Sequence, residues 1–203
     1  MRLRKILQGA NKKVFQRLRI FFRKKFKFIP PLTIISSDCS GGVLLHDYGL
    51  ALDTPTVNMI ITGDDFLRLC ENLEEYLSKE LVEVDGGDHA VALCADVKLD
   101  AIHYRTFEQL NSAWRRRSAR VHFDNIVFLF SENQIENEEQ LDRFAKLKGR
   151  KLVLASEGYS HKYPFINHIR SYNNGQFFFM GISGKRRYEK DFDLYRWLKE
   201  KEK

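Results

Sequence analysis

The segment from residue 32 to residue 50 constrains the fold more than any other part of the chain. Its first five residues, Leu-Thr-Ile-Ile-Ser, form an apolar run that predicts a buried strand. Residues 37–42 (Ser-Asp-Cys-Ser-Gly-Gly) predict a tight turn, and a short helix follows from a cap at Ser40 to a stop at Gly49. Strand-to-helix turns are typical of α/β proteins, which place ligands at the carboxyl edge of the sheet. We therefore predict a functional site in this turn.

Strand-like and helix-like segments alternate through most of the remaining chain. Further strands are expected at residues 56–61, 81–84, 90–94, 97–99, 125–130, 151–155 and 176–180. Further helices are expected at residues 64–77, 106–119, 136–148 and 191–199, with Asp64 and Thr106 as caps. This order predicts a three-layer α/β fold, with a mixed, mainly parallel sheet flanked by helices. We expect one such domain over residues 31–203, preceded by a basic arm over residues 1–30.

The three cysteines, Cys39, Cys70 and Cys94, are widely spaced and form no Cys-x-x-Cys pair. This argues against a disulfide framework and a structural zinc site, and it favours a reducing, cytosolic setting. The first 30 residues lack the apolar segment of a secretory signal. No apolar run approaches the roughly 20 residues that a membrane-spanning helix needs. We therefore expect a cytoplasmic protein.

The basic arm differs from the body in charge. Residues 1–28 contain eleven Lys and Arg residues and no acid; the whole chain has a net charge of +7, so the remaining residues sum to −4. Apolar residues of the arm recur every three or four positions, which predicts an amphipathic helix ending before Pro30-Pro31. These residues are Leu3, Leu7, Ala10, Val14, Leu18 and Phe21, with Phe15 and Phe22 widening the stripe.

A basic amphipathic helix of this kind suits an anionic bilayer, where each cation adds about 1 kcal/mol of attraction. We therefore expect residues 1–28 to hold the protein on the inner face of the cell membrane. In a second interpretation the apolar stripe packs on the body or on another subunit. Nucleic acid ranks last as a partner, because the body is acidic and carries no recognisable binding motif.

The turn after the first strand offers candidate catalytic groups. A thiol at Cys39 would lie near a helix N-terminus, which favours the thiolate, and the N–H groups of Gly41 and Gly42 could face an anion. His46 is the nearest candidate acid or base, with Asp38 or Asp64 orienting it. The competing interpretation is a buried cysteine in a tight turn, an exposed histidine, and helix capping by Asp64. Asp38 and Asp64 alone are too few ligands to indicate a metal.

A second candidate region combines arginine with aromatic side chains. Arg116 and Arg120 are four residues apart on one helix face, where guanidinium groups could clamp phosphate or carboxylate. Trp114 on the same helix could stack on a sugar or base, and His103 ends the preceding strand. The competing interpretation is a solvated cationic face with Trp114 and His103 in the core. The functional interpretation requires this helix and the turn, including Ser40, to line one shared hollow.

Several motifs together resemble a bacterial family of unknown function whose members are often labelled exopolysaccharide biosynthesis proteins. The resemblance covers roughly residues 32–180. It rests on residues 34–42 (Ile-Ile-Ser-Ser-Asp-Cys-Ser-Gly-Gly), 46–50 (His-Asp-Tyr-Gly-Leu), 54–56 (Thr-Pro-Thr), 64–66 (Asp-Asp-Phe), 103–106 (His-Tyr-Arg-Thr) and 114–120 (Trp-Arg-Arg-Arg-Ser-Ala-Arg).

The resemblance implies a role in assembling exopolysaccharide or capsule, and no particular reaction. The expected function is a transferase that modifies a glycan or lipid-linked sugar, with a sugar nucleotide, an acyl donor or a glycan as substrate. The alternative is a non-catalytic glycan-binding or scaffold protein of the same machinery. The sequence indicates no particular cofactor.

Overall fold

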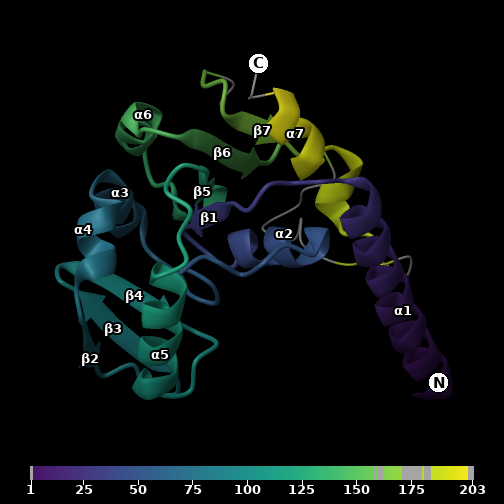
Figure 1. Ribbon diagram of the computed structural model, residues 1–203, viewed down its shortest axis with the longest axis horizontal. Helices are drawn as coiled ribbons and strands as arrows, with labels where there is room; N and C mark the ends of the chain where they lie inside the picture. Colours follow the sequence, from purple (N-terminus) through teal and green to yellow (C-terminus); the bar gives the residue numbers. More distant parts are fainter. Residues whose placement is uncertain (1, 158, 160–161, 171–179, 181–183, 201–203) are drawn as a thin grey trace.

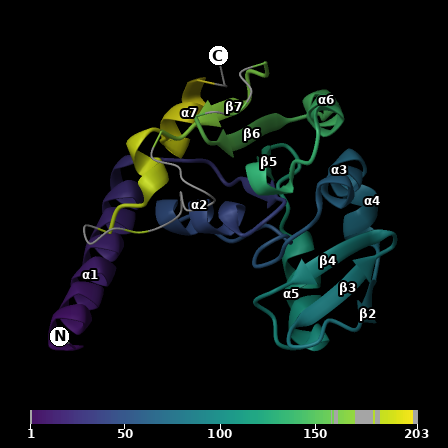
Figure 2. The same ribbon diagram turned by 180° about the vertical axis from the view of Figure 1, so that it is seen from behind.

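A computed structural model describes residues 2–157, 159, 162–170, 180 and 184–200 of the chain. In these ranges a long N-terminal helix, α1 (Arg2–Phe26), lies at one end of the molecule, and a small antiparallel sheet lies at the other end (Figures 1 and 2). A parallel sheet lies between them.

The parallel sheet contains four strands in the order β1-β5-β6-β7. Their bounds are β1 Thr33–Ser36, β5 Ile126–Ser131, β6 Arg150–Ala155 and β7 Ile166–His168. Ile35 lies opposite Phe128, and Leu129 lies opposite Leu152. Because all three pairings are parallel, the carboxyl ends of the four strands share one edge. The turn after β1 begins at that edge.

The second sheet is an antiparallel meander in the order β2-β3-β4. Its strands are β2 Leu81–Val84, β3 Ala90–Cys94 and β4 Val97–Ala101. The expected α/β class with a mainly parallel sheet and flanking helices is thus confirmed. The strands expected over residues 81–99 exist, but they form a sheet of their own.

Each face of the parallel sheet has its own hydrophobic core. Ile34 and Leu129 face one core, which α2 (Ser40–Tyr48), the 3-10 turn η2 (Arg187–Lys190) and α7 (Leu194–Glu200) cover. Residues that alternate with these, such as Ile35 and Phe128, face the other core. That second core also takes side chains from the antiparallel sheet, so it joins the two sheets. Its helices are α3 (Gly63–Glu71), α4 (Leu73–Ser78), α5 (Phe107–Ser118) and α6 (Glu138–Lys146).

The chain leaves β1 and β5 toward opposite faces of the sheet. The segment after β1 forms α2 on one face, whereas β5 is followed by the 3-10 turn η1 (Glu132–Gln134) and by α6 on the other face. A crevice outside the strand ends forms where successive connections diverge in this way. The fold therefore places its expected ligand position between the carboxyl ends of β1 and β5.

Residues 56–61 do not form the expected strand. Asn58 has φ of 67°, a left-handed conformation that interrupts extended backbone, and Ile60 alone makes an isolated bridge, to Asp100. The segment still runs along β1, because Thr56 Oγ1 accepts a hydrogen bond from Ser36 N at 3.0 Å and Ile61 N donates to Ser37 O at 2.9 Å.

Some helix and strand boundaries also differ from the sequence-based expectation. The helix expected at residues 64–77 is broken at Asn72 into α3 and α4, and Thr62 rather than Asp64 occupies its N-cap position, without a side-chain capping hydrogen bond. Cys39 occupies the N-cap position of α2, without a capping hydrogen bond from its side chain, which makes Ser40 the first helical residue. The strand expected at residues 176–180 lies, apart from Met180, outside the described residues. The sequence did not predict β7.

Two local signals are confirmed. Thr106 caps α5, since its side chain accepts a hydrogen bond from Gln109 N. Gly49 ends α2 in a left-handed conformation, with φ of 66°. Both features depend only on residues within one turn of the helix end.

Candidate functional site

Asp38 organises the turn after β1. Its Oδ1 atom accepts hydrogen bonds from Ser40 N at 2.9 Å and from the Ser40 hydroxyl. Ser36 Oγ donates to the Asp38 carbonyl at 2.6 Å. The carboxylate and Ser40, which is buried, therefore hold the turn in shape. The structure does not place Asp38 beside His46 as the expected orienting group.

Cys39 follows Asp38 and is half-buried. Burial, and then the charge of Asp38, raise the pKa of its thiol to about 11. This shift is opposite to the one expected from a helix N-terminus. The thiol is therefore protonated near neutral pH, which corrects the expectation of a thiolate.

Gly41 packs against the strand that precedes it. A Cβ atom there would lie 2.7 Å from Ser36 Cβ, so only glycine fits, and the Gly41 N–H donates to Ser36 Oγ at 3.2 Å. That N–H is thus already used inside the turn. A Cβ at Gly42 would make an ordinary contact of 3.4 Å with Val57. The close packing of Gly41 on β1 explains the first glycine without an anion.

His46 lies in the last turn of α2, and 56% of its side chain is exposed. It follows Cys39 by seven positions, which corresponds to about 10 Å along the helix axis. Its Nδ1 atom lies 3.4 Å from Asp47 Oδ1. The structure therefore does not bring the imidazole to the thiol.

Asp64 lies in the first turn of α3, which begins near the carboxyl edge because Ile61 contacts Ser37. Its carboxylate pairs with Arg143 Nη1 of α6 at 3.0 Å. The expected position at this edge is consistent with the fold, but the acid has a partner other than His46.

The arginine helix, α5, lies against the antiparallel sheet (Figure 1). Trp114 is 1% exposed and belongs to the core, so it offers no stacking surface. Arg116 and His103 are exposed. Arg120 Nη1 lies 3.3 Å from Asp53 Oδ1. The core position of Trp114 corrects its expected role in binding.

Arg120 and the turn after β1 lie at opposite edges of the parallel sheet. The Asp53 carbonyl accepts a hydrogen bond at 2.8 Å from Thr33 Oγ1, at the amino end of β1, whereas Asp38 follows the carboxyl end. The four residues of β1 span about 13 Å. The expected shared hollow between the arginine pair and the turn is therefore wrong.

The carboxyl edge instead gathers polar groups from the other strands. Glu132, which follows β5, accepts hydrogen bonds from Ser156 N at 2.8 Å and from Ser156 Oγ at 2.6 Å. His168, the last residue of β7, has its Nδ1 atom 2.9 Å from the Ser156 carbonyl. We call Asp38, Cys39, Glu132, Ser156 and His168 the carboxyl-edge cluster, because each ends or follows a strand of the parallel sheet.

Sequence reasoning missed three members of this cluster, although a signal for two was present. Glu132 and Ser156 directly follow two strands that the sequence predicts, and parallel strands bring such residues to one edge. His168 gave no such signal, because β7 itself was not predicted.

A buried hydrogen bond joins the carboxyl ends of β1 and β5 at this edge. Ser131 N donates to Ser37 Oγ at 2.9 Å, and both residues are buried. The Ser131 hydroxyl has no hydrogen-bond partner among the described residues. Carboxylates, hydroxyls and an imidazole at one edge are groups that bind a polar, hydroxyl-bearing ligand.

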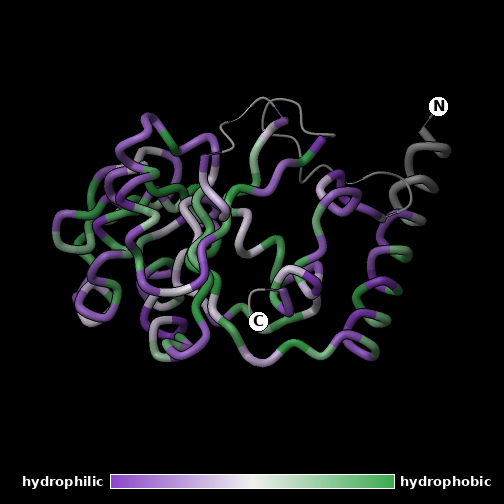
Figure 3. Tube along the Cα trace, turned by 90° about the horizontal axis from the view of Figure 1, so that it is seen from above, coloured by the Kyte–Doolittle hydropathy of each residue, from purple (hydrophilic) through white to green (hydrophobic). Residues whose placement is uncertain are grey.

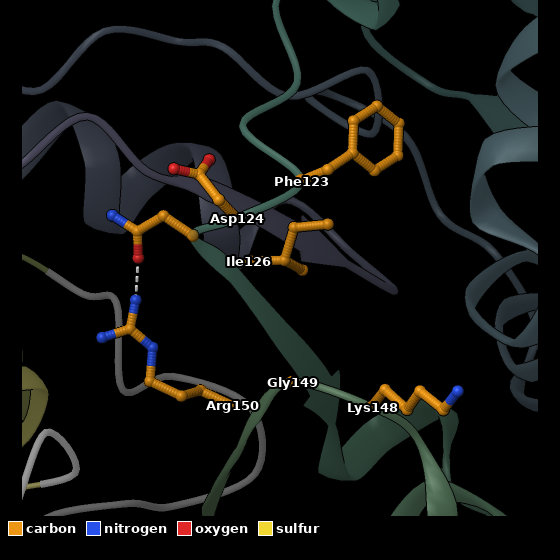
Figure 4. A pocket seen from close by; sticks show the side chains of 7 residues that line it. Phe123, Asp124, Ile126, Lys148, Gly149 and Arg150 are labelled. Carbon is orange, nitrogen blue, oxygen red and sulfur yellow. Dashed lines mark hydrogen bonds between the residues drawn. The ribbon is translucent and has the colours of Figure 1, made fainter.

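A further hollow lies at the opposite, amino edge of the parallel sheet. It measures about 460 Å³ and opens between the starts of β5 and β6 (Figure 4). Arg150 reaches across it to hydrogen-bond Asn125, and Asp124 and Lys148 add opposite charges at its rim. It contains none of the residues that the sequence singled out.

The basic arm is docked on the body through its charged face. Arg19 and Arg23 both bond Glu189 Oε2, the second at 2.5 Å, and Lys27 pairs with Asp193. Arg23 also donates to the Asp47 carbonyl at 2.8 Å. Glu189 is 5% exposed in its side chain, so these pairs are largely removed from water.

Asp47 is a second buried acid behind this contact. Arg186 pairs with its carboxylate, and Tyr188 donates to Oδ2 at 3.1 Å. The Asp47 side chain is 4% exposed. Together Glu189 and Asp47 join α1, α2 and η2 into one unit.

The apolar stripe of α1 faces away from the body. Hydrophobic and hydrophilic residues alternate along this helix at one side of the molecule (Figure 3). The outward residues are 47–67% exposed, and they are Val14, Phe15, Leu18, Phe21, Phe22 and Phe26. We call these six residues the outward stripe. The interpretation in which this stripe packs on the body is therefore wrong for these residues.

The described residues contain neither a membrane-crossing helix nor a metal-binding group of side chains. None of their helices combines the length and the apolar character that crossing a bilayer requires. Nor do they contain three or more His, Cys, Asp or Glu side chains grouped so as to hold a metal ion.

The protein is of the α/β class: its parallel sheet is covered on both faces, and the carboxyl-edge cluster lies at one edge of that sheet. Residues 11–199 match the family described as Domain of unknown function (DUF1919), and the chain belongs to that family. An uncharacterised protein of Haemophilus influenzae is 29% identical over 177 residues, covering 82% of this chain and 84% of that protein.

Proposed function

We propose that this protein is a membrane-peripheral component of cell-surface polysaccharide biosynthesis that works at the inner face of the cell membrane. The observation that carries the proposal is the outward stripe on α1. An exposed apolar patch of this kind marks an interaction surface. Its residues recur along one face of a docked helix, so the patch is presented in a fixed orientation.

Charge favours a lipid surface over a second copy of the chain. Arg17 and Lys25 are exposed cations three or four residues from members of the outward stripe, and Lys13 and Lys24 are further exposed cations of α1. A second copy would bring the same cations face to face, which is costly, whereas anionic lipid offers the opposite charge. Aromatic residues beside cations are also typical of helices that lie in the membrane interface.

A transferase acting on a glycan or lipid-linked sugar is the first candidate for the chemistry. The resemblance of the motifs at residues 34–56 and 103–120 suggests glycan assembly, and the carboxyl-edge cluster offers acceptors for sugar hydroxyls. In this role Glu132 would serve as the acid or base, since it follows β5 at the point where the chain connections diverge. Membrane attachment would keep the site close to lipid-linked intermediates.

A non-catalytic glycan-binding or scaffold protein is the second candidate, and two observations favour it. The raised pKa of Cys39 leaves the thiol protonated, and His46 lies two helical turns away from it. In this role the same edge would bind glycan without transferring a group.

Vesicle binding tests the membrane part of the proposal. We expect the variant Phe21→Ser/Phe22→Ser to bind anionic vesicles about tenfold or more weakly than the wild type, because burial of one Phe side chain contributes about 1.5 kcal/mol or more. Phe123→Ser is the matched control, since Phe123 is also about half exposed but lies at the amino edge. Equal loss in both variants, or no loss in either, contradicts the proposal.

Complementation of a deletion strain separates the two candidates. A transferase predicts that Glu132→Gln abolishes glycan modification while the unfolding midpoint in urea stays near that of the wild type. Cys39→Ala and His46→Ala test, in the same assay, the two catalytic candidates that the sequence suggested. Full complementation by all three variants, together with failure of Phe21→Ser/Phe22→Ser, identifies the scaffold instead.

A further inference from the structure

A small hollow lies between α1 and the C-terminal segment, beside the outward stripe. It measures about 280 Å³. Its charged lining consists of Arg19, Arg23, Lys27, Lys185, Glu189 and Asp193. Phe22, from the outward stripe, is also part of the lining. We call this space the α1–η2 hollow.

The α1–η2 hollow carries an excess of positive charge. Four cations face two carboxylates, which leaves a net charge of +2. Burial and the neighbouring Arg23 lower the pKa of Arg19, so the two guanidinium groups crowd one another despite Glu189. A bound anion would relieve this repulsion.

Hydrogen-bond donors remain for such an anion. In the part of the chain that the structure describes, Arg19 contacts Glu189 through Nη2, which leaves its Nε and Nη1 hydrogens available. The Lys185 ammonium is exposed and makes no ion pair or hydrogen bond with a described residue. Guanidinium forks and ammonium groups are the usual ligands of phosphate oxygens.

The surroundings of the hollow indicate that the phosphate belongs to a lipid. Phe22 lines the hollow and is four residues from Leu18 and Phe26, so the outward stripe continues from its rim in both directions. An anion held here would have its apolar part next to exposed hydrocarbon. At about 280 Å³ the hollow fits a headgroup rather than a whole lipid, since pockets for drug-sized ligands span about 300–1,000 Å³.

We propose that the α1–η2 hollow binds the headgroup of a lipid phosphomonoester while the outward stripe contacts the acyl region. A phosphomonoester carries about −1.5 to −2 charges at neutral pH, which matches the net charge of the lining. A phosphodiester headgroup carries a single charge and matches it less well. The inference rests on the proposed membrane contact and names the lipid class that α1 selects.

The test compares vesicles that differ in phosphate type. Phosphatidylcholine vesicles containing either phosphatidic acid, a phosphomonoester, or phosphatidylglycerol, a phosphodiester, are matched for zeta potential and titrated with the full-length protein. We expect about fivefold tighter binding to phosphatidic acid, equivalent to about one additional cation contact. Inorganic phosphate is titrated in parallel, and we expect it to displace vesicles only weakly.

Two lysine variants test whether the preference for phosphatidic acid comes from the α1–η2 hollow. The test variant is Lys185→Gln, and its control is Lys190→Gln. Both lysines are exposed and lie in or beside η2, but only Lys185 lines the hollow. We expect Lys185→Gln to remove most of the preference for phosphatidic acid while keeping phosphatidylglycerol binding, and Lys190→Gln to keep both.

The outcomes separate this inference from the proposed function. Absence of wild-type binding to any anionic vesicle overturns the membrane proposal and the inference with it. Equal binding to the two matched vesicles, or equal behaviour of the two lysine variants, overturns the headgroup site alone. Displacement of vesicles by micromolar inorganic phosphate assigns the hollow to free phosphate and overturns the lipid.

Discussion

Helices α1 and α5 are both cationic and amphipathic, yet they turn opposite faces toward the body. In α5 the apolar residues Leu110, Ala113 and Trp114 are buried and Arg116 is exposed. In α1 the cations Arg19 and Arg23 lie against the body, and the outward stripe is exposed.

The partner surface accounts for the difference. Helix α5 faces the apolar side of the antiparallel sheet and packs into the shared core. Helix α1 faces η2 and α2, where Glu189 and Asp47 are buried acids that need positive partners. Amphipathicity therefore shows that a helix has two faces, and the acids beneath it select the face that docks.

The largest expected effect comes from the apolar face of α5. Trp114→Ala should lower the free energy of unfolding by about 3–5 kcal/mol, because it removes a fully buried indole and leaves a cavity. Urea unfolding measures this loss. A loss under about 1 kcal/mol would mean that α5 does not use its apolar face as described, and the contrast with α1 would disappear.

Among arginine substitutions, the larger loss of unfolding free energy should occur on α1 and the smaller one on α5. Arg23→Ala should cost about 2 kcal/mol, because it removes charge-assisted hydrogen bonds to the buried Glu189 and to the Asp47 carbonyl. Arg116→Ala is the control and should stay within about 0.5 kcal/mol, since its side chain is exposed. Equal costs in urea unfolding would remove the distinction between the docked face of α1 and the open face of α5.

A smaller effect on stability is expected when the pH is lowered until Asp193 is protonated. Burial opposes ionisation of Asp193, but Lys27 and the Arg196 amide outweigh it, so the pKa of this carboxyl is lowered. Its stabilising contribution is therefore complete above the ordinary aspartate pKa of about 3.9 and is lost as the pH falls below that value. Because both partners are about one-third exposed, the contribution is a few tenths of a kcal/mol.

Lys27→Met tests this contribution. The stability difference between wild type and Lys27→Met should be present at pH 7 and vanish near pH 3, as measured by urea unfolding. Arg115→Met is the comparison on α5, where the pair with Glu80 is exposed and should contribute nothing measurable at either pH. A Lys27→Met difference that persists at pH 3 would show that Asp193 does not hold α1.

The smallest effect is expected on the outward stripe. Phe22→Ala should change the free energy of unfolding by no more than about 0.5 kcal/mol, because 53% of the residue is exposed. Thermal or urea unfolding without lipid measures it. A loss comparable to that of Trp114→Ala would mean that the stripe is buried in solution and that α1 resembles α5 after all.

The sequence alone was sufficient for features set by neighbouring residues. The alternation of strand-like and helix-like segments predicted the α/β class, and Thr106 and Gly49 marked helix ends correctly. It also located the turn at Asp38 and Cys39 at the end of β1. These signals work because strand period, capping and left-handed glycine are local properties of the chain.

The tertiary structure decided how these local pieces meet. Strand order placed Glu132 and Ser156 at the carboxyl edge with Asp38, and it sent Arg120 to the amino edge. Periodicity along α1 revealed an apolar face but not what it would meet. The buried Glu189, some 170 residues further along the chain, determined that the cations dock and the apolar face stays open, because a buried charge needs a partner of opposite sign.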